Sequence, residues 1–189
     1  DQALVSVTVV APRRAGISGS APACSNGASF ALFGFLTGNP ETGGTWSNGT
    51  GMYDPATNSS GAFTYTLAGT TPCPNAISTV TVAEVAAPNA GTSSATTVCS
   101  NDGPFNMTLR LGGTPQVGTW TFGGNAHNDL FIPGVDLPGV YVYTVPGVAP
   151  CTAAIATLTV GVNQAPNAGV NGDTLTCSTG ASFGLFGLL

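Results

Sequence analysis

Charged residues are rare in this sequence, and lysine is absent. Only 6% of its 189 residues carry a charge, against about 25% in an average protein. The three basic residues are Arg13, Arg14 and Arg110, and the formal net charge is −5. Nucleic acids and anionic membrane surfaces are bound by clustered lysine and arginine, so this composition argues against both as partners.

Long hydrophobic runs are also missing. Hydrophobic residues make up 42% of the chain, yet no apolar stretch approaches the roughly 20 residues that a transmembrane helix needs. The content of β-branched and aromatic residues is too high for a disordered chain. The remaining positions are largely Thr, Ser, Asn and Gly, which is typical of extracellular β proteins. The composition therefore predicts a folded protein without membrane insertion.

What the sequence does contain is an internal repeat. The phrase AAPNAG at 86–91 recurs as QAPNAG at 164–169 and more loosely as APRRAG at 11–16. A cysteine follows the last glycine of each phrase at a constant distance. The period of about 75–78 residues suits a small autonomous domain. We expect two complete modules, 11–86 and 87–164. Residues 1–10 match the last strand of a preceding module, and 165–189 match the first strands of an incomplete third.

Within each module, alternation with a period of two indicates β-strands. Examples are VSVTVV at 5–10 and AIATLTV at 154–160, and clusters of turn residues such as TGNPETGG at 37–44 separate such runs. Short strands divided by such turns are typical of sandwiches and barrels, and no helical periodicity is apparent. The sequence predicts an all-β protein of tandem Ig-like β-sandwich modules, arranged as an elongated array.

Each complete module contains two cysteines, Cys24 and Cys73 in the first and Cys99 and Cys151 in the second. Because the pairs occupy equivalent positions, we predict one disulfide per module, Cys24–Cys73 and Cys99–Cys151. Each bond would close a loop of about 50 residues, worth roughly 4 kcal/mol in the chain-entropy model, and would require an oxidising compartment. Zinc is the alternative, but the sequence has no CxxC motif and one histidine. Cys177 would be unpaired or paired outside this segment.

Aromatic residues also recur at equivalent positions. Trp46 ends GGTW and Trp120 ends VGTW. Either ring could stack on a sugar, but the repetition favours a core position in each module. The stretch VDLPGVYVY at 135–143 has the D-x-x-G-x-Y layout of a tyrosine corner, a structural hydrogen bond of β-sandwiches. Phe63 occupies the tyrosine's place in the first module, so we expect no such bond there.

Residues that could carry chemistry are scattered. Four aspartates could contribute to calcium sites: Asp54, Asp102, Asp129 and Asp136. The sequence lacks a D-x-D-x-D loop, and turn capping explains these residues better. Catalysis would require His127 to converge with Asp129 and Asp136, and His127 has no counterpart in the first module. We predict no catalytic residues, no metal and no cofactor.

The recurring phrases together are APNAG at 87–91 and 165–169, CSND at 99–102, GTW at 118–120, GVYVYTV at 139–145 and PC at 150–151. This set resembles the tandem Ig-like (PKD-like) repeats of very large secreted Bacteroidota surface proteins, such as gliding-motility adhesins and related cell-surface filaments. The resemblance covers essentially the whole chain. It implies export, an extracellular location at the bacterial cell surface, and no catalytic residues to carry over. APRRAG departs from the pattern because Arg13 and Arg14 replace the usual Asn-Ala.

The last thirteen residues, CSTGASFGLFGLL at 177–189, nearly repeat CSNGASFALFGFL at 24–36. Left exposed, this stretch would form an apolar patch, so we expect further copies of the module to cover it. These copies would belong either to the same longer chain or to neighbouring subunits joined head to tail. The longer chain is favoured, because 1–10 and 165–189 together lack the tryptophan strand. The side chains at this assembly end are Phe183, Leu185, Phe186, Leu188 and Leu189.

Three functions are compatible with these features. Repetition, low charge and paired cysteines favour a structural segment of an extracellular bacterial fibre or adhesin stalk. A module that binds carbohydrate or another surface is the second hypothesis, and surface glycans would then be its partners. An enzyme is the third and has the least support.

Overall fold

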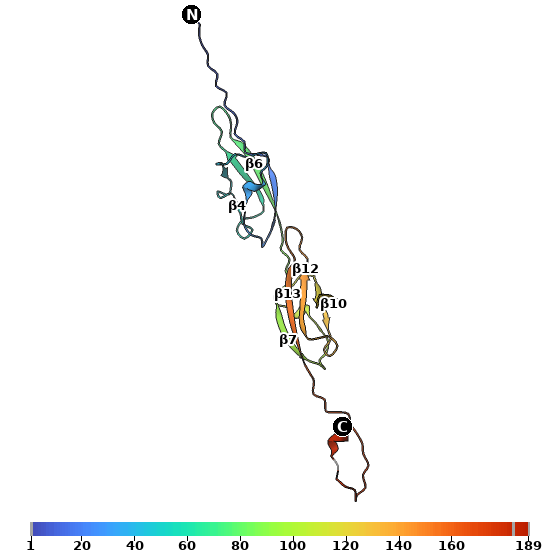
Figure 1. Ribbon diagram of the computed structural model, residues 1–189. Helices are drawn as coiled ribbons and strands as arrows, with labels where there is room; N and C mark the ends of the chain where they lie inside the picture. The colour runs from blue at the N-terminus through green and yellow to red at the C-terminus, as the bar shows by residue number, and fades with distance from the viewer. Residues whose placement is uncertain (1, 183, 189) are drawn as a thin grey trace. The chain divides into compact units, whose positions relative to one another are not determined.

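The computed structural model describes residues 2–182 and 184–188, and strands dominate it (Figure 1). The chain divides into two compact units. The first comprises Asp1–Gly91, Gly113–Gly118 and Tyr143–Ala156, and the second comprises Thr92–Gly112, Thr119–Val142 and Thr157–Leu189. The module limits at 86 and 164 remain a prediction.

The first repeat forms one four-stranded and one two-stranded sheet. The larger sheet has the order β1-β6-β5-β3, and β2 pairs with β4. The strands are β1 (Gly19–Cys24), β2 (Phe30–Ala31), β3 (Thr45–Trp46), β4 (Met52–Tyr53), β5 (Gly61–Leu67) and β6 (Ala76–Val85). A 3-10 turn, η1 (Leu32–Phe35), follows β2. The pair β1–β6 is parallel, whereas β5–β6 and β3–β5 are antiparallel.

The core of the first repeat lies between these two sheets. Tyr53 from β4, Tyr65 from β5 and Val80 from β6 are almost fully buried in one cluster. Aromatic rings join the layers, since Tyr53 packs edge-on against Phe63 with centroids 5.6 Å apart. The two sheets therefore form a sandwich, as the alternating pattern predicted.

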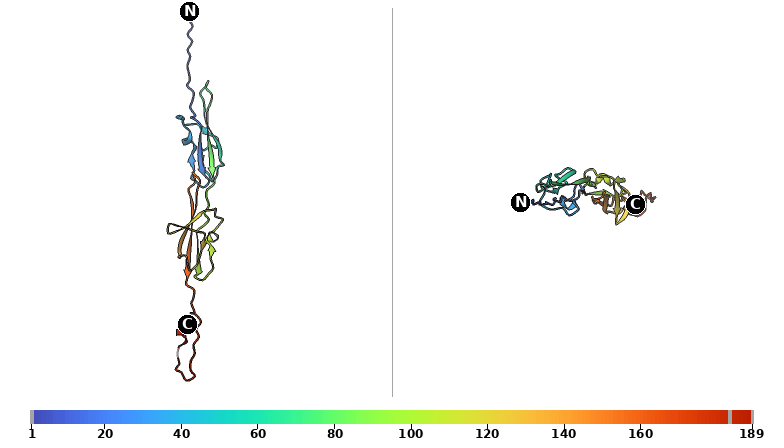
Figure 2. Two further views of the ribbon diagram at one scale, coloured as in Figure 1. Left: turned by 90° about the vertical axis from the view of Figure 1, so that its right-hand side faces the viewer. Right: turned by 90° about the horizontal axis from the view of Figure 1, so that it is seen from above.

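The second repeat has the same strand order, with one additional strand, β10, at the edge. Its larger sheet runs β10-β9-β12-β13-β7, and β11 pairs with β8. Figures 1 and 2 show β7 beside β13, and these two strands are parallel. The strands are β7 (Ser94–Cys99), β8 (Phe105–Asn106), β9 (Thr119–Phe122), β10 (Asn125–His127), β11 (Leu130–Phe131), β12 (Gly139–Val145) and β13 (Ala154–Asn163). A 3-10 turn, η2 (Thr108–Arg110), follows β8.

The buried face of β13 was readable from the sequence. Ala156, Leu158 and Val160 are buried, and the intervening residues are more exposed. This is the two-residue period of a strand with one face on a core. The expected fold class is confirmed: the protein is all-β, with Ig-like β-sandwich repeats.

The flanking segments contain little regular structure. Residues 2–10 have no strand partner in the described part of the chain, and Leu4, Val5, Val7 and Val9 are exposed. After β13, the one further element within the described ranges is the 3-10 turn η3 (Leu185–Leu188). No helix in residues 2–182 and 184–188 is long and apolar enough to cross a membrane.

Candidate functional site: a disulfide between sequence repeats

A single disulfide is formed among the described cysteines, and it joins Cys24 to Cys151. The Cα atoms are 5.0 Å apart, although the two residues are separated by 127 positions in the sequence. Cys24 belongs to the first sequence repeat and Cys151 to the second. Both residues are buried, whereas Cys73 is partly exposed and Cys99 and Cys177 are exposed free thiols.

The predicted pairs Cys24–Cys73 and Cys99–Cys151 are therefore wrong, as is one disulfide per module. Cys24 ends β1 and lies opposite Val85, the last residue of β6, because these strands run parallel. Cys73 precedes Ala76, the first residue of β6. The ten residues of β6 span about 30 Å, far more than the roughly 7 Å limit between bonded cysteine Cα atoms. The two cysteines of the first repeat thus lie at opposite ends of one sheet.

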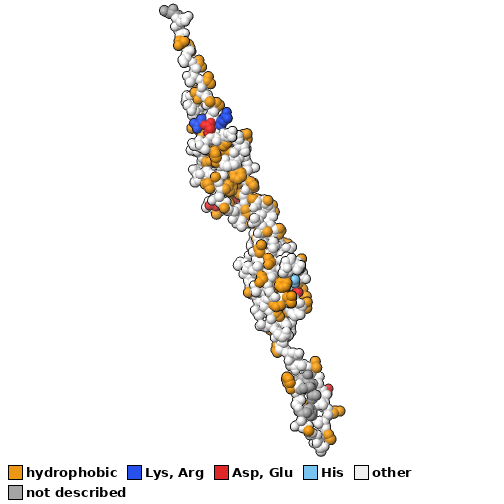
Figure 3. All heavy atoms as spheres, viewed as in Figure 1, with side chains coloured by type: hydrophobic (Ala, Val, Ile, Leu, Met, Phe, Trp, Pro, Cys, Tyr) orange, Lys and Arg blue, Asp and Glu red, His pale blue; other side chains and the backbone are white. Residues whose placement is uncertain are grey.

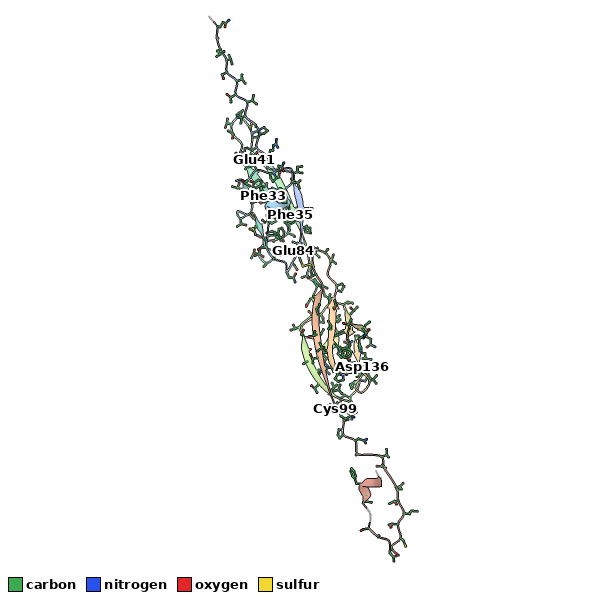
Figure 4. The ribbon with its side chains drawn as sticks, viewed as in Figure 1. Phe33, Phe35, Glu41, Glu84, Cys99 and Asp136 are labelled. Carbon is green, nitrogen blue, oxygen red and sulfur yellow. A yellow bond between two sulfur atoms is a disulfide. The ribbon has the colours of Figure 1, made fainter. Side chains whose placement is uncertain are left out.

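The same geometry separates the cysteines of the second repeat. Cys99 ends β7 opposite Asn163, the last residue of β13, and Cys151 precedes Ala154, its first residue. Figure 4 labels Cys99 at the far end of this sheet, and in the first repeat it labels Glu84, the neighbour of Val85, at the corresponding end. In both repeats, parallel pairing of the first and last long strands places one cysteine at each end.

A tight loop presents Cys151. The amide of Cys151 donates to the carbonyl oxygen of Val148 at 2.9 Å. Gly147 is required in this loop, because a Cβ there would overlap the carbonyl oxygens of Cys151 and Thr152. The Cys151 sulfur lies 3.4 Å from the carbonyl oxygen of Val85, which ends the strand that pairs with β1. The loop of the second repeat is thus held against the strand ends where Cys24 lies.

The arginine departure in APRRAG does not alter the local backbone contacts. Arg14 and Glu41 exchange two hydrogen bonds, from Arg14 N to the Glu41 carboxylate at 3.0 Å and from Glu41 N to Arg14 O at 2.8 Å. Asn89 and Gln116 exchange the same two bonds at 3.0 and 2.8 Å. Arg14 therefore takes the place of Asn89 and Arg13 that of Pro88, so the assignment of the two arginines to the Asn-Ala pair is wrong. An ion pair of 2.6 Å between Arg13 and Glu41 is added in the first repeat. Figure 3 shows blue and red side chains next to one another where the N-terminal segment meets the first repeat.

The two tryptophans belong to the cores of their repeats. Trp120 is 3% exposed, and its indole N–H donates to Thr108 Oγ1 at 3.1 Å. Trp46 is half-buried and packs on Tyr65 with ring centroids 5.1 Å apart. The backbone of Gly51, with φ +69°, covers the edge of this ring so closely that a Cβ would lie 2.6 Å from it. The expected core role is confirmed, and a buried Trp120 offers no face to a sugar.

The predicted tyrosine corner is present in the second repeat. The hydroxyl of Tyr141 donates to the carbonyl oxygen of Leu137 at 2.8 Å. Burial and, second, the Asp136 carboxylate raise the pKa of Tyr141. Phe63 in the first repeat has no hydroxyl, and its ring contacts Tyr53 instead.

The residues considered for catalysis do not converge. His127 Nε2 lies 3.4 Å from the Asp136 carboxylate, but Asp129 accepts a hydrogen bond from the Asn106 side chain at 2.6 Å. The other Asp136 oxygen accepts the amide of Ile132 at 2.6 Å, which is a turn-capping role. In the part of the chain that the structure describes, no group of three or more His, Cys, Asp or Glu side chains could hold a metal ion.

The predicted assembly end is described only in part. Leu185 is 70% exposed and Phe186 is 89% exposed. Leu188 lies in η3, whereas Phe183 and Leu189 are outside the described residues. Cys177 is exposed, and hydrogen bonds from Thr179 lower the pKa of its thiol. Coverage of this end by other copies of the module remains a prediction.

No protein-family model and no curated protein matches the chain. Among solved structures, an I-band fragment of titin is similar over 80% of this chain and 65% of its own, with 12% sequence identity and a TM-score of 0.44. A mutated variant of a three-Ig titin fragment gives 13% identity, the same coverage and a TM-score of 0.43. A pair of tandem titin Ig domains gives 12% identity, coverage of 82% and 97%, and a TM-score of 0.32. The chain spans 65% of the length of the first two.

Sequence reasoning identified the cysteines but missed their partners. The equal spacing between repeats is compatible with pairing inside a repeat and with pairing across two repeats. Parallel alignment of β1 with β6 distinguishes the two, and no local pattern in the sequence reports strand direction.

Proposed function

We propose that this chain is a structural segment of an extracellular bacterial fibre or adhesin stalk, built from Ig-like repeats in an elongated array. The bond between Cys24 and Cys151 carries this proposal. When a chain is pulled along its length, tension can pass through this pair of sulfur atoms. The loop between these cysteines, which are 127 positions apart in the sequence, then carries no load. A bond that bridges two repeats suits a chain that bears load along its length.

The proposed location rests on the same bond and on the resemblance in sequence. Disulfides form and persist in oxidising compartments outside the cytoplasm. The resemblance of its recurring phrases to the repeats of secreted Bacteroidota surface proteins, gliding-motility adhesins among them, supports a location at the bacterial cell surface. The modules of this chain have boundaries near 11–86 and 87–164. The partners of the chain are further copies of this module, in the same longer chain or in neighbouring subunits.

The alternatives are less well supported by the side chains. A carbohydrate platform would use the recurring tryptophans, but Trp120 is buried. An acid–base centre would use free carboxylates, but Asp129 and Asp136 accept hydrogen bonds from neighbouring groups. Aspartates that hold turns and tryptophans that fill cores suit a protein whose task is mechanical.

Immunogold electron microscopy of the native cells tests the proposal. With antibodies raised against this chain, we expect gold particles along the length of surface fibres. Cells in which the coding sequence has been deleted provide the control and should show no label. Gold confined to fibre tips would instead identify a terminal binding module, and gold on isolated particles would exclude a fibre segment.

A further inference from the structure

Two free cysteines have the same local surroundings as the two cysteines of the observed disulfide. Cys99 resembles Cys24, and Cys73 resembles Cys151. We infer that disulfides join consecutive repeats in series. In each bond, the cysteine at the end of the first long strand of one repeat pairs with the loop cysteine of the next repeat along the chain. Cys24–Cys151 is one such bond, Cys99 is the strand-end half of the following bond, and Cys73 is the loop half of the preceding one. This inference rests on the geometry of the cysteines and is independent of the proposed function.

The strand-end half is defined by the residues around Cys24. Cys24 lies opposite Val85 in the parallel ladder. Ser25 then closes the strand end, since its amide donates to Val85 O at 2.9 Å and its hydroxyl accepts the amide of Ala87 at 2.9 Å. These bonds fix the direction in which the chain leaves the repeat, beside the Cys24 sulfur.

The surroundings of Cys99 repeat this arrangement. Cys99 lies opposite Asn163 in the parallel ladder of the second repeat. The amide of Ser100 donates to Asn163 O at 2.8 Å, and the hydroxyl of Ser100 accepts the amide of Ala165 at 2.9 Å. The backbone around Cys99 thus has the same strand pairing and the same serine hydrogen bonds as the backbone around Cys24. The two sites have one difference. Cys24 is buried against its partner loop, whereas Cys99 is exposed.

The loop half is repeated as well. The amide of Cys73 donates to Thr70 O at 2.8 Å, which forms the same turn as in the loop of Cys151. The Cys73 thiol lies 3.4 Å from the carbonyl oxygen of Val10. The Cys151 sulfur lies at the same distance of 3.4 Å from Val85 O, and Val10 is the counterpart of Val85 one repeat earlier. Cys73 is thus placed beside the incoming segment, where a preceding strand-end cysteine would lie.

A glycine at one position shapes both loops. A Cβ on Gly69 would overlap the carbonyl oxygens of Cys73 and Pro74, as a Cβ on Gly147 would overlap those of the second loop. The tip that carries the cysteine therefore needs the same glycine in both repeats. The two loops therefore share the same hydrogen bonds and backbone conformation, although Cys73 forms no disulfide.

Formation of each bond is a two-electron oxidation of two thiols by a disulfide reagent. The thiolate of the strand-end cysteine attacks the reagent and displaces one of its thiols, which gives a mixed disulfide. The thiolate of the loop cysteine attacks the protein sulfur and displaces the second thiol. Two protons leave the cysteines, two electrons reduce the reagent, and one protein disulfide remains. A thiol–disulfide oxidoreductase or oxidised glutathione supplies this chemistry.

An extended chain tests the inference directly. A second copy of residues 37–86 is fused after residue 189, which completes the third repeat, because 177–189 nearly repeats 24–36. The chain is refolded with reduced and oxidised glutathione, free thiols are alkylated, and peptides are mapped without reduction. We expect the appended copy of Cys73 to bond to Cys99, which removes the alkylation of Cys99. Cys177 and the original Cys73 should remain alkylated.

The variants Cys99→Ser and Cys177→Ser are a matched pair, since they alter equivalent strand-end cysteines one repeat apart. Cys99→Ser should free the appended cysteine for alkylation, whereas Cys177→Ser should leave its bond intact. A bond from Cys177 to the appended cysteine would overturn the inference, and so would disulfide-linked dimers. In a second extended chain, a copy of residues 112–163 follows residue 189, so that the third repeat is completed with the sequence of the second repeat and not of the first. If Cys99 remains alkylated in both extended chains, the inference fails.

Discussion

Removing the Cys24 sulfur should greatly increase the length to which this chain can be stretched. In the oxidised protein, a chain held by its two ends transmits force through the bond from Cys24 to Cys151. The chain between these two cysteines, which are 127 positions apart, cannot be extended. At about 3.5 Å per extended residue, the bond prevents roughly 440 Å of chain from being extended. Single-molecule force–extension measurements read this length without reference to stability.

The Cys24→Ser variant should therefore gain about 440 Å in final extension over the oxidised wild-type chain. Reduction of the wild-type chain should give the same gain. The double variant Cys73→Ser/Cys99→Ser, which removes only free thiols, should behave as the wild type. The size of the gain also separates the possible pairings. A bond from Cys24 to Cys73 would conceal only about 50 residues, so the same variant would gain about 170 Å. Such a gain, or none, would refute the assignment.

Three further predictions concern the cores. Tyr141→Phe should lower the free energy of unfolding by about 1 kcal/mol, measured by urea denaturation, because it removes the hydroxyl that donates to Leu137 O; an unchanged midpoint would contradict this. Trp120→Ala should cost about 3–5 kcal/mol, measured by circular dichroism during denaturation, because the ring is 3% exposed; a loss below about 1 kcal/mol would mean that the ring is not a core group. Burial and the hydrogen bond to Glu84 raise the pKa of Tyr53 from 10.0 to about 12, so folding stability should fall as pH rises from about 10 to about 12. Ultraviolet titration of tyrosinate in the wild type and in Tyr53→Phe measures this pKa by difference: the two curves should coincide at pH 10 and separate only toward about pH 12. A smaller tyrosinate signal in the variant already at pH 10 would show that the pKa of Tyr53 is not raised.

The cores could be anticipated from sequence because strands alternate over a short distance. The buried face of β13 follows from neighbouring residues alone, as Leu158 and Val160 illustrate. The tyrosine corner at Tyr141 was equally local, since its acceptor Leu137 is four residues away. Repetition added the remaining information, because a tryptophan found once per repeat is more simply a core residue than a ligand site.

The sequence alone thus determined the repeats, the strands, the buried faces and the residues that could form disulfides. Only the tertiary structure decided which sulfur atoms meet. Cys24 and Cys73 flank one sheet in the sequence, but the parallel alignment of β1 with β6 puts them at opposite ends of it. Strand direction arises from long-range backbone pairing, which leaves no local pattern in the residues. The Cys24 sulfur is therefore reached by the loop of Cys151, 127 positions away, and not by the other cysteine of its own repeat.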